Sequence, residues 1–576
     1  MIIDKFSFDI ASVEDVRGIE HYGSKVGDNW PVVYVLNNNE EAYVGETVNA
    51  ATRMKQHLVT PAKKQLTEIR IITDKDYNKS VILDLESFLI KHMSADGKYN
   101  LINGNHGIQD HEYYQKSQYE ERFREVWNKL KSHGIVSQSI DDIENSELFK
   151  YSPYKSLGEE QKEAEIMILR ALAECQNNKE KATILVNGGA GTGKTILAIY
   201  LMKLIADINN TEDHFVELTD YIDEDAESVF ATDCLRDIKK IGIVLPQKSL
   251  RESLTSVFKT IRSLKPSMVL NTTDVVKDYL DSGEKFDLLI VDEAHRLKCR
   301  DKGHLAFYTG FDNANKALGL DKMTGTELDW MFMCSKNVIL FRDEKQTVRP
   351  CDIDTERFNQ IIDNYQTDNS VKIQIPLETQ WRCKGGNDYI KYIHNIFYGR
   401  QQEYQEIENY DLRLYEDVDA MVNDIKELDK EYGLCRVAAG YAWEWQSKKD
   451  PSKYDIFIGD NKYRWNSTDT DWVVSKNAIN EIGCIHTVQG YDLNYLGVII
   501  GKELYYDTIR GEIRADKNNY HDQQGKSGCA FNHDLLRDYL INIYLTLMTR
   551  GIRGTYVYVC DDALREYMKQ FIKAQE

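Results

Sequence analysis

The chain has 576 residues, of which 42% are hydrophobic and 11% aromatic, and its formal net charge is −21. One hydrophobic core does not extend over such a length, so several domains are expected. No run of about 18 apolar residues occurs, which excludes a predicted membrane span, and the start of the chain lacks a secretory pattern. The negative charge argues against a protein that coats nucleic acid through bulk electrostatics, but it allows a local basic groove.

Ten cysteines are scattered along the chain without a CxxC pair. This spacing is typical of free thiols in a reducing compartment rather than of a zinc site or a disulfide framework. We therefore expect a cytoplasmic protein with no membrane segment.

The first hundred or so residues have the pattern of a small mixed α/β unit. Val32–Leu36 is a predicted strand, Asn37–Asn39 a turn, and Ala42–Gly45 the start of a second strand, so a hairpin is expected. A third strand is predicted at Ile69–Thr73 and an apolar helix at Val81–Met93.

Polar residues occur on the predicted helices of this unit. Arg53 and His57 are four residues apart, so they share one helix face. Glu86 lies between Leu85 and Leu89 on the apolar helix, and a carboxylate in such surroundings requires a partner.

In this order these residues resemble the GIY-YIG nuclease family over much of residues 1–108. Tyr34 and Tyr43 match its two signature tyrosines, although the triplets here are Val-Val-Tyr and Tyr-Val-Gly. The resemblance implies a catalytic set made of Tyr34, Tyr43, Arg53, His57, Glu86 and Asn103, with Asn100 as the alternative to Asn103. Glu86 would hold one divalent ion, Arg53 would neutralise charge on phosphorus, and Tyr34, helped by His57, would activate water. For the tyrosines alone, core packing is an equal explanation.

A charged stretch follows this unit. Between residues 114 and 130, aromatic and aliphatic side chains recur at helical spacing until Gly134 ends the pattern, and Ser137–Ser146 is polar. We predict a connecting helix and a linker over residues 109–150.

From residue 151, predicted strands alternate with longer helices, which indicates parallel sheets with crossover connections. One series of strands is expected at Ile184–Asn187, Ile241–Leu245, Leu288–Asp292 and Asn337–Phe341. A second series is expected at Cys435–Ala439, Gly483–His486, Leu496–Ile500 and Thr555–Cys560. The predicted fold class is α/β, with a small mixed α/β domain at 1–108 followed by two tandem RecA-like parallel-sheet lobes at 151–375 and 376–576.

The strongest local signal is a phosphate-binding loop. The segment Gly188-Gly189-Ala190-Gly191-Thr192-Gly193-Lys194-Thr195 follows an apolar strand and opens an apolar helix. Backbone at Gly188, Gly191 and Gly193 would wrap anionic oxygens. Lys194 would reach the β- and γ-phosphates, and Thr195 would ligate Mg²⁺.

A second motif, Asp292-Glu293-Ala294-His295, follows a buried-strand pattern. Asp292 would hold Mg²⁺, and Glu293 is placed to orient or deprotonate the attacking water. The two motifs together predict that the chain binds and hydrolyses ATP.

With these motifs the chain resembles superfamily 1 helicases through most of residues 151–576. The resemblance implies that Gln161 reads adenine, Gln346 senses the γ-phosphate, and Arg382 and Arg550 reach the phosphates from the second lobe. Arg553 is the alternative to Arg550.

Other segments resemble the parts of these enzymes that contact a nucleic-acid strand, namely Gln247-Lys248 and His486-Thr487-Val488-Gln489-Gly490. The Asp-Glu-Ala-His form and the segment around Trp443 and Trp445 resemble a less characterised helicase-like family. These tryptophans could stack on bases or pack within the second lobe.

The resemblances imply an ATP-driven nucleic-acid motor fused to a metal-dependent endonuclease, with one Mg²⁺ in each site. DNA is expected as the partner more than RNA, and defence against foreign DNA or DNA restriction as the context. Two alternatives stay open: an ATPase switch that gates the nuclease without translocation, and a repair helicase whose amino-terminal domain only docks on DNA.

Overall fold

The computed structural model describes the residues 1–103, 113, 116–144, 146–154, 157–189, 191–210, 233–300, 305–344, 352–380, 383–468, 472–488, 491–522 and 533–575. The chain groups into two compact units, residues 1–179 with 195–243 and 251–269, and residues 180–194 with 244–250 and 270–576. Within the described part, no helix is both long and apolar enough to cross a membrane.

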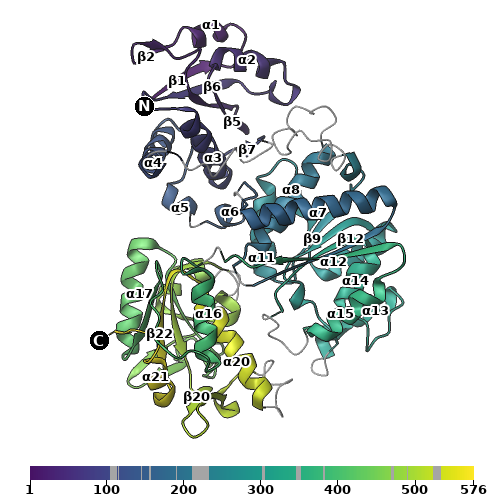
Figure 1. The fold of residues 1–576 in the computed structure, drawn as a ribbon, viewed down its shortest axis with the longest axis vertical. Helices are drawn as coiled ribbons and strands as arrows, with labels where there is room; N and C mark the ends of the chain where they lie inside the picture. Colours follow the sequence, from purple (N-terminus) through teal and green to yellow (C-terminus); the bar gives the residue numbers. More distant parts are fainter. Residues whose placement is uncertain are drawn as a thin grey trace. The chain divides into compact units, whose positions relative to one another are not determined.

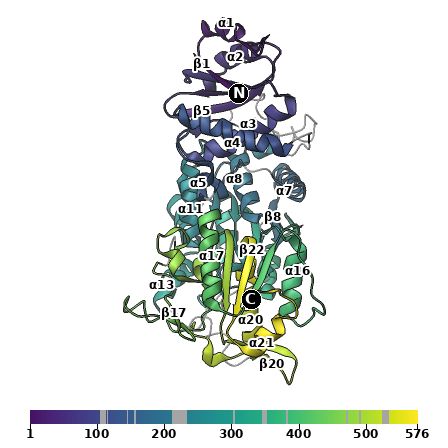
Figure 2. The same cartoon turned by 90° about the vertical axis from the view of Figure 1, so that its left-hand side faces the viewer.

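The amino-terminal domain is built on a five-stranded sheet with the strand order β1-β6-β4-β5-β7. Its elements are β1 (Ile2–Ser7), α1 (Ser12–Arg17), β2 (Glu20–His21), β3 (Ser24–Lys25), β4 (Val32–Asn37), β5 (Glu41–Thr47), α2 (Ala50–Val59), η1 (Pro61–Lys63), β6 (Glu68–Thr73), α3 (Lys79–Asp96) and β7 (Asn100–Leu101). Strand β4 is central and buried along its whole length, because α1 and α2 cover one face of the sheet and α3 and α4 the other (Figures 1 and 2). This explains the unbroken apolar run at Val32–Leu36.

The hairpin predicted from the sequence is confirmed, since β4 and β5 pair antiparallel and Asn37 lies opposite Ala42. Strand β1, which the pattern analysis did not predict, pairs antiparallel with β6.

The polar stretch Ser137–Ser146, predicted as a linker, contains helix α5 (Ile140–Glu144), between α4 (Lys116–Ser132) and α6 (Glu147–Lys150). The buried carboxylate of Asp96, at the end of α3, accepts hydrogen bonds from the backbone of Ser137 and Gln138. These hydrogen bonds attach the segment to the end of α3, while the Ser137 side chain remains exposed.

The first large sheet has the strand order β10-β9-β11-β12-β8-β13, and its pairs β11–β12, β12–β8 and β8–β13 are parallel. Its elements are α7 (Glu159–Asn178), β8 (Lys181–Gly188), α8 (Lys194–Asn210), β9 (Ile241–Val244), α11 (Lys248–Lys259), η2 (Pro266–Met268), β10 (Val269–Leu270), α12 (Thr272–Ser282), β11 (Phe286–Val291), η3 (Ala294–Arg296), α13 (Leu305–Ala317), α14 (Glu327–Cys334), β12 (Ser335–Arg342), α15 (Thr355–Tyr365) and β13 (Ser370–Leu377). All four predicted strands are confirmed, and α12 to α15 form a hydrophobic core with the sheet.

The second large sheet is parallel throughout, with the order β18-β15-β19-β22-β14-β23. Its lobe contains α16 (Gly386–Phe397), β14 (Asp411–Tyr415), α17 (Val418–Tyr432), β15 (Arg436–Ala439), β16 (Ile456–Ile458), β17 (Asn461–Tyr463), η5 (Trp472–Val474), η6 (Ala478–Asn480), β18 (Ile482–Cys484), α18 (Ile485–Val488), β19 (Leu493–Ile500), β20 (Leu504–Asp507), β21 (Glu512–Ala515), η7 (Lys517–Asn519), α20 (His533–Met548), β22 (Gly551–Val559), α21 (Asp562–Met568) and β23 (Ala574–Gln575). Helix α17 packs on one face of the sheet, and α16 and α20 pack on the other (Figure 1).

One predicted strand of this lobe needs correction. The strand expected at Gly483–His486 ends at Cys484, and His486 lies in the short helix α18. The hydroxyl of Thr487 donates to the carbonyl of Cys484 at 3.0 Å and accepts that residue's N–H at 3.0 Å, so it stabilises the turn from strand to helix.

Candidate functional site

The phosphate-binding loop joins the end of β8 to the start of α8. Gly191 and Gly193 have φ angles of 80° and 79°, in the left-handed region that favours glycine. The ammonium of Lys194 donates to the carbonyl oxygens of Gly188 and Gly189, each at 2.7 Å. The lysine therefore points into the loop, where it can exchange these carbonyls for phosphate oxygens. Thr195 follows as the second residue of α8.

Gln380 is a residue of this site that the sequence analysis did not select. Its buried side chain lies over Gly191, so close that a Cβ on Gly191 would be 2.0 Å from the Gln380 Oε1. A side chain at position 191 would have to displace the end of Gln380 and would also strain the left-handed backbone. Gln380 lies in the segment Thr379-Gln380-Trp381-Arg382, in which the helicase resemblance had pointed to Arg382. Trp381, Arg382 and Gln346 lie outside the described residues.

Asp292 and Glu293 stand where β11 ends. Asp292 is completely buried, and Glu293 has a φ of 53°, an uncommon left-handed conformation for a residue with a side chain. Such backbone conformations persist only where the surroundings hold them, and they cluster at functional sites. The Glu293 carboxylate faces His295, whose Nε2 lies 3.0 Å from its Oε2.

His295 connects this carboxylate to the end of β12. Its ring is fully buried, and its Nδ1 accepts the backbone N–H of Asp343 at 3.2 Å. Because Nδ1 is an acceptor, the ring proton is on Nε2, which faces the Glu293 carboxylate at 3.0 Å without the alignment of a hydrogen bond. His295 was part of the recognised motif, but its bond to Asp343 depends on the pairing of β11 with β12.

The electrostatics keep Glu293 ionised. Burial alone would raise the pKa of its carboxyl, but His295, Arg296 and Lys194 together hold that pKa below the usual range of a glutamic acid. A group that must accept a proton or orient water has to be deprotonated, so this shift suits the predicted role of Glu293.

Gln161 lies at the start of α7 and is buried, but its Oε1 accepts the backbone N–H of Gly158 at 2.9 Å. The side chain thus caps its own helix. Reading adenine with the same oxygen would require this bond to open.

The two candidate arginine fingers of the second lobe differ in their surroundings. Arg550 is buried in the turn between α20 and β22, and its carbonyl accepts the N–H of Leu493 at 3.1 Å. The guanidinium of Arg553 lies over the ring of Tyr432, 4.6 Å from the ring centroid. This stacking engages Arg553 elsewhere in the lobe and favours Arg550 for the predicted role.

In the amino-terminal domain, three predicted residues come together from three elements. Tyr34 on β4, Tyr43 on β5 and His57 on α2 have ring centroids 5.2 to 6.3 Å apart. Tyr34 Oη lies 2.7 Å from His57 Nε2. Tyr34 also covers Gly45, where a Cβ would lie 2.3 Å from the tyrosine hydroxyl, so the glycine of Tyr-Val-Gly makes room for the ring.

Lys63 completes this cluster and was not predicted as a site residue. It is buried, with its ammonium 3.1 Å from His57 Nδ1 and 3.6 Å from the Tyr43 ring centroid. An ammonium has only hydrogens to donate, so Nδ1 accepts and His57 donates from Nε2 to Tyr34. Burial, Lys63 and Arg53 lower the pKa of His57 to about 2, so its ring is neutral.

Arg53 and Glu86 act on the same tyrosine from α2 and α3. Burial raises the pKa of the Tyr34 phenol above its usual range; Arg53 opposes the shift and the charge of Glu86 adds to it. Asn103 is buried, donates to the carbonyl of Val44 at 2.8 Å and accepts its N–H at 3.0 Å. Its amide is therefore bonded to β5 and positions that strand.

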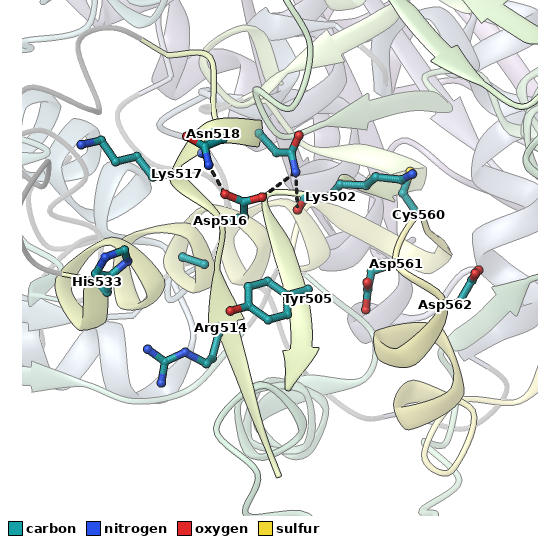
Figure 3. Close-up of a pocket in the computed structure, with 12 residues that line it drawn as sticks. Lys502, Tyr505, Arg514, Asp516, Lys517, Asn518, His533, Cys560, Asp561 and Asp562 are labelled. Atoms are coloured by element: carbon teal, nitrogen blue, oxygen red, sulfur yellow. Dashed lines mark hydrogen bonds between the residues drawn. The ribbon is translucent and has the colours of Figure 1, made fainter. Parts of the chain in front are cut away.

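A separate pocket of about 670 Å³ lies in the second lobe and contains none of the predicted site residues (Figure 3). Its charged lining residues have both signs: Lys502, Arg514, Lys517, His533, Asp516, Asp561 and Asp562. Asp561 caps α21, and Asp516 accepts the side-chain amide of Asn519 at 2.8 Å. With its carboxylates bonded locally, the mixed lining selects no ligand class.

Two RecA-like parallel sheets, with a phosphate-binding loop after β8 and an Asp-Glu pair after β11, define a helicase-like ATPase. The chain belongs to the Schlafen group 3 family, whose DNA/RNA helicase domain matches residues 181–561.

It is 27% identical over 418 residues to the uncharacterized protein YPL245W of Saccharomyces cerevisiae, covering 67% of this chain and 84% of that protein. Among solved structures it is similar to the Pif1 helicase from Bacteroides in complex with ADP-AlF3 and ssDNA, with 11% identity, a TM-score of 0.24, and coverage of 69% of this chain and 92% of that chain. The Pif1 helicase from Candida albicans gives 10% identity, a TM-score of 0.27, and coverage of 72% and 98%.

Proposed function

We propose that the protein is an ATP-dependent nucleic-acid-processing enzyme in which a helicase-like motor acts together with an amino-terminal, metal-dependent endonuclease. The observation that supports the motor best is the series of contacts from Glu293 through His295 to Asp343, in which His295 Nε2 lies 3.0 Å from the Glu293 carboxylate and Nδ1 accepts the N–H of Asp343. It joins a half-buried, ionised carboxylate next to the phosphate-binding motif to the segment that follows β12. Such a connection lets the state of the nucleotide affect a second part of the lobe.

In the proposed ATPase reaction, the loop backbone and Lys194 bind the β- and γ-phosphates, and Glu293 orients or deprotonates the attacking water. The donor set suits Mg²⁺, because Asp292 offers a buried carboxylate and Thr195 a hydroxyl, both hard oxygen ligands. The bound ion would neutralise charge on the phosphates. Arg382 and Arg550 are proposed to complete the site, and Gln346 to sense the γ-phosphate.

The nuclease proposal is supported by the meeting of buried Tyr34 and His57 with half-buried Tyr43 and Arg53 in one cluster. Arg53 would stabilise the charge that develops on the phosphate, and Tyr34 would take a proton from water. His57 cannot accept the phenol proton, because its Nε2 is a donor; it would instead stabilise the phenolate. Since burial raises the Tyr34 pKa, cleavage is expected to accelerate with rising pH through the neutral range.

The metal of this second site would rest on Glu86. A carboxylate is a ligand that Mg²⁺ accepts, and the ion commonly keeps waters and substrate phosphate oxygens as its remaining ligands. Within the described residues no group of three metal-binding side chains occurs, so the ion would depend on the substrate for binding. When bound, it would polarise the phosphate and support the leaving oxygen.

Cleavage assays would test the proposal: single-stranded, duplex and forked DNA and RNA with Mg²⁺, with and without ATP. Glu86→Ala should abolish cleavage, whereas Asp84→Ala, which removes a carboxylate two residues away on α3, should not. Lys194→Ala should abolish ATP hydrolysis, whereas Lys181→Ala, at the exposed start of β8, should not.

Each outcome has a distinct meaning. Cleavage that requires both ATP and Glu86 supports one coupled enzyme, and strand displacement would identify the ATPase as a motor. ATP-gated cleavage without strand displacement supports the switch alternative. Cleavage on no substrate would reduce residues 1–108 to a docking domain on a helicase. DNA as the main substrate, a cytoplasmic location and a role in defence against foreign DNA or DNA restriction belong to the same proposal.

A further inference from the structure

The second lobe carries a small hairpin, β16 and β17, outside its main sheet (Figure 2). The strands pair antiparallel around a two-residue turn, with Ile458 opposite Asn461 and a φ of 58° at Gly459. Ile456 is fully buried and Tyr463 packs beside it on the core of the lobe. Because side chains alternate along a strand, the next pair, Phe457 and Lys462, faces outward.

The outward face of this hairpin is aromatic and positively charged. Phe457 is 55% exposed, and Lys462 opposite it is exposed as well. Two cations lie against the ring of Tyr454: the ammonium of Lys462 is 4.9 Å from the ring centroid, and the guanidinium of Arg464 is 4.5 Å from it. Arg464 is held in place by donating from Nε to the carbonyl of Lys453 at 3.0 Å.

The local charge is opposite to that of the whole chain. Residues 448–464 contain five basic and three acidic residues in a chain of net charge −21. One of the acids, Asp455, is buried and accepts the backbone N–H groups of Ser447 and Trp465, so its charge does not face outward. The hairpin therefore carries a local excess of positive charge on a chain whose net charge is negative.

We propose that the outward face of this hairpin binds an unpaired DNA strand, with a base stacking on Phe457 and phosphates pairing with Lys462 and Arg464, both of which lie against the Tyr454 ring. Every base has a face that can stack on an aromatic ring, and phosphates attract the neighbouring cations, so such a surface binds single strands with little sequence preference. This inference rests on the proposed function.

A protein partner explains the surface less well. A stable protein interface buries about 800 Å² on each side around an apolar centre, and the single exposed phenylalanine here is surrounded by cations. Charge complementarity favours a polyanion.

The test is binding of a fluorescein-labelled dT20 oligonucleotide to the full chain, measured by anisotropy at several salt concentrations. Phe457→Ala combined with Lys462→Ala should weaken binding at least about five-fold, and loss of Lys462 should reduce the salt slope by about 1. The matched control is Ile509→Ala combined with Arg510→Ala on the hairpin of β20 and β21, where Ile509 is 96% exposed. The control should change the affinity less than two-fold.

Wild-type affinity in the Phe457 and Lys462 double variant would overturn the inference while leaving the proposed function intact. A wild-type chain that does not bind dT20 even at low salt would overturn the motor proposal, and this inference with it. Both changed side chains face solvent, so a melting temperature equal to that of the wild type is expected and confirms that the variant is folded. ATP hydrolysis without nucleic acid should be the same in all three proteins.

Discussion

Replacing His295 with alanine tests the connection between the proposed water-activating carboxylate and the end of β12. In the wild type, Nε2 of this ring lies 3.0 Å from the Glu293 carboxylate, Nδ1 accepts the N–H of Asp343 at 3.2 Å, and the ring is completely buried. The variant removes both contacts at once. We expect a slower hydrolysis step with little change in nucleotide affinity, because neither contact involves the phosphate-binding loop.

The size of the effect follows from the contact with Glu293. A polar contact that lacks the full alignment of a charge-assisted hydrogen bond contributes about 1–1.5 kcal/mol, which corresponds to about a 5- to 13-fold loss in kcat if it is fully used in the transition state. The pH profile should change too. Burial raises the pKa of Glu293 and His295 is the largest opposing influence, so the variant's pKa rises. The carboxylate is then protonated at a higher pH, and the acid limb of kcat moves upward.

The assay is steady-state ATP hydrolysis between about pH 5.5 and 9, with fluorescent-nucleotide binding measured in parallel. His133→Ala, which removes an exposed histidine, serves as the control and should leave both quantities unchanged. A double-mutant cycle with Glu293→Gln separates an effect through the carboxylate from a general disturbance. In the Glu293→Gln background, where no carboxylate remains, His295→Ala should cost less than about three-fold further.

An equal loss of kcat on His295→Ala in both backgrounds would contradict this prediction, because His295 would then act independently of Glu293. Wild-type kcat and an unshifted acid limb in the single variant would refute it as well. A collapse of nucleotide affinity would show instead that the ring supports the loop.

Three further predictions concern the packing of the site and of its surroundings. Gly191→Ala should lower ATP affinity at least about ten-fold, because an alanine in this left-handed conformation costs about 1–2 kcal/mol and its Cβ collides with Gln380. Adding Gln380→Ala to the same chain should recover part of the lost ATP affinity in a binding titration. Burial raises the pKa of Glu503 from 4.5 to about 7, so the free energy of unfolding falls as pH rises through this interval. Glu503→Gln should recover about 3 kcal/mol and raise Tm more at pH 8 than at pH 5.5. An equal gain in Tm at both pH values would contradict the assignment. Asp96→Ala should lower the free energy of unfolding by about 1–3 kcal/mol and accelerate hydrogen exchange at the amides of Ser137 and Gln138. Unchanged protection of these amides would show that their hydrogen bonds to Asp96 are unimportant.

Features carried by adjacent residues were accessible to pattern reasoning. The predicted strands of the first lobe were confirmed because each is a short apolar run bounded by polar residues. The strand at Ser370–Leu377 was not predicted, because it lies at the sheet edge and only its last residues are buried. The residues around His486 were predicted as a strand, although the backbone turns into a helix there. The turn is stabilised by the hydrogen bonds of the Thr487 hydroxyl to the backbone of Cys484, and the hydrophobic periodicity gives no sign of these bonds.

Residue types alone predict ATP binding and hydrolysis, because the phosphate-binding loop and the Asp-Glu pair each consist of adjacent residues with a defined role; the tyrosine and arginine set of the first domain remains a proposal for nuclease chemistry. Only the tertiary structure decided which side chains complete these motifs. Gln380 over Gly191, Asp343 on His295 and Lys63 on His57 each depend on two elements meeting in space. The physical reason is that hydrogen bonding and close packing act over a few ångströms between atoms, whereas a sequence pattern records only neighbours along the chain.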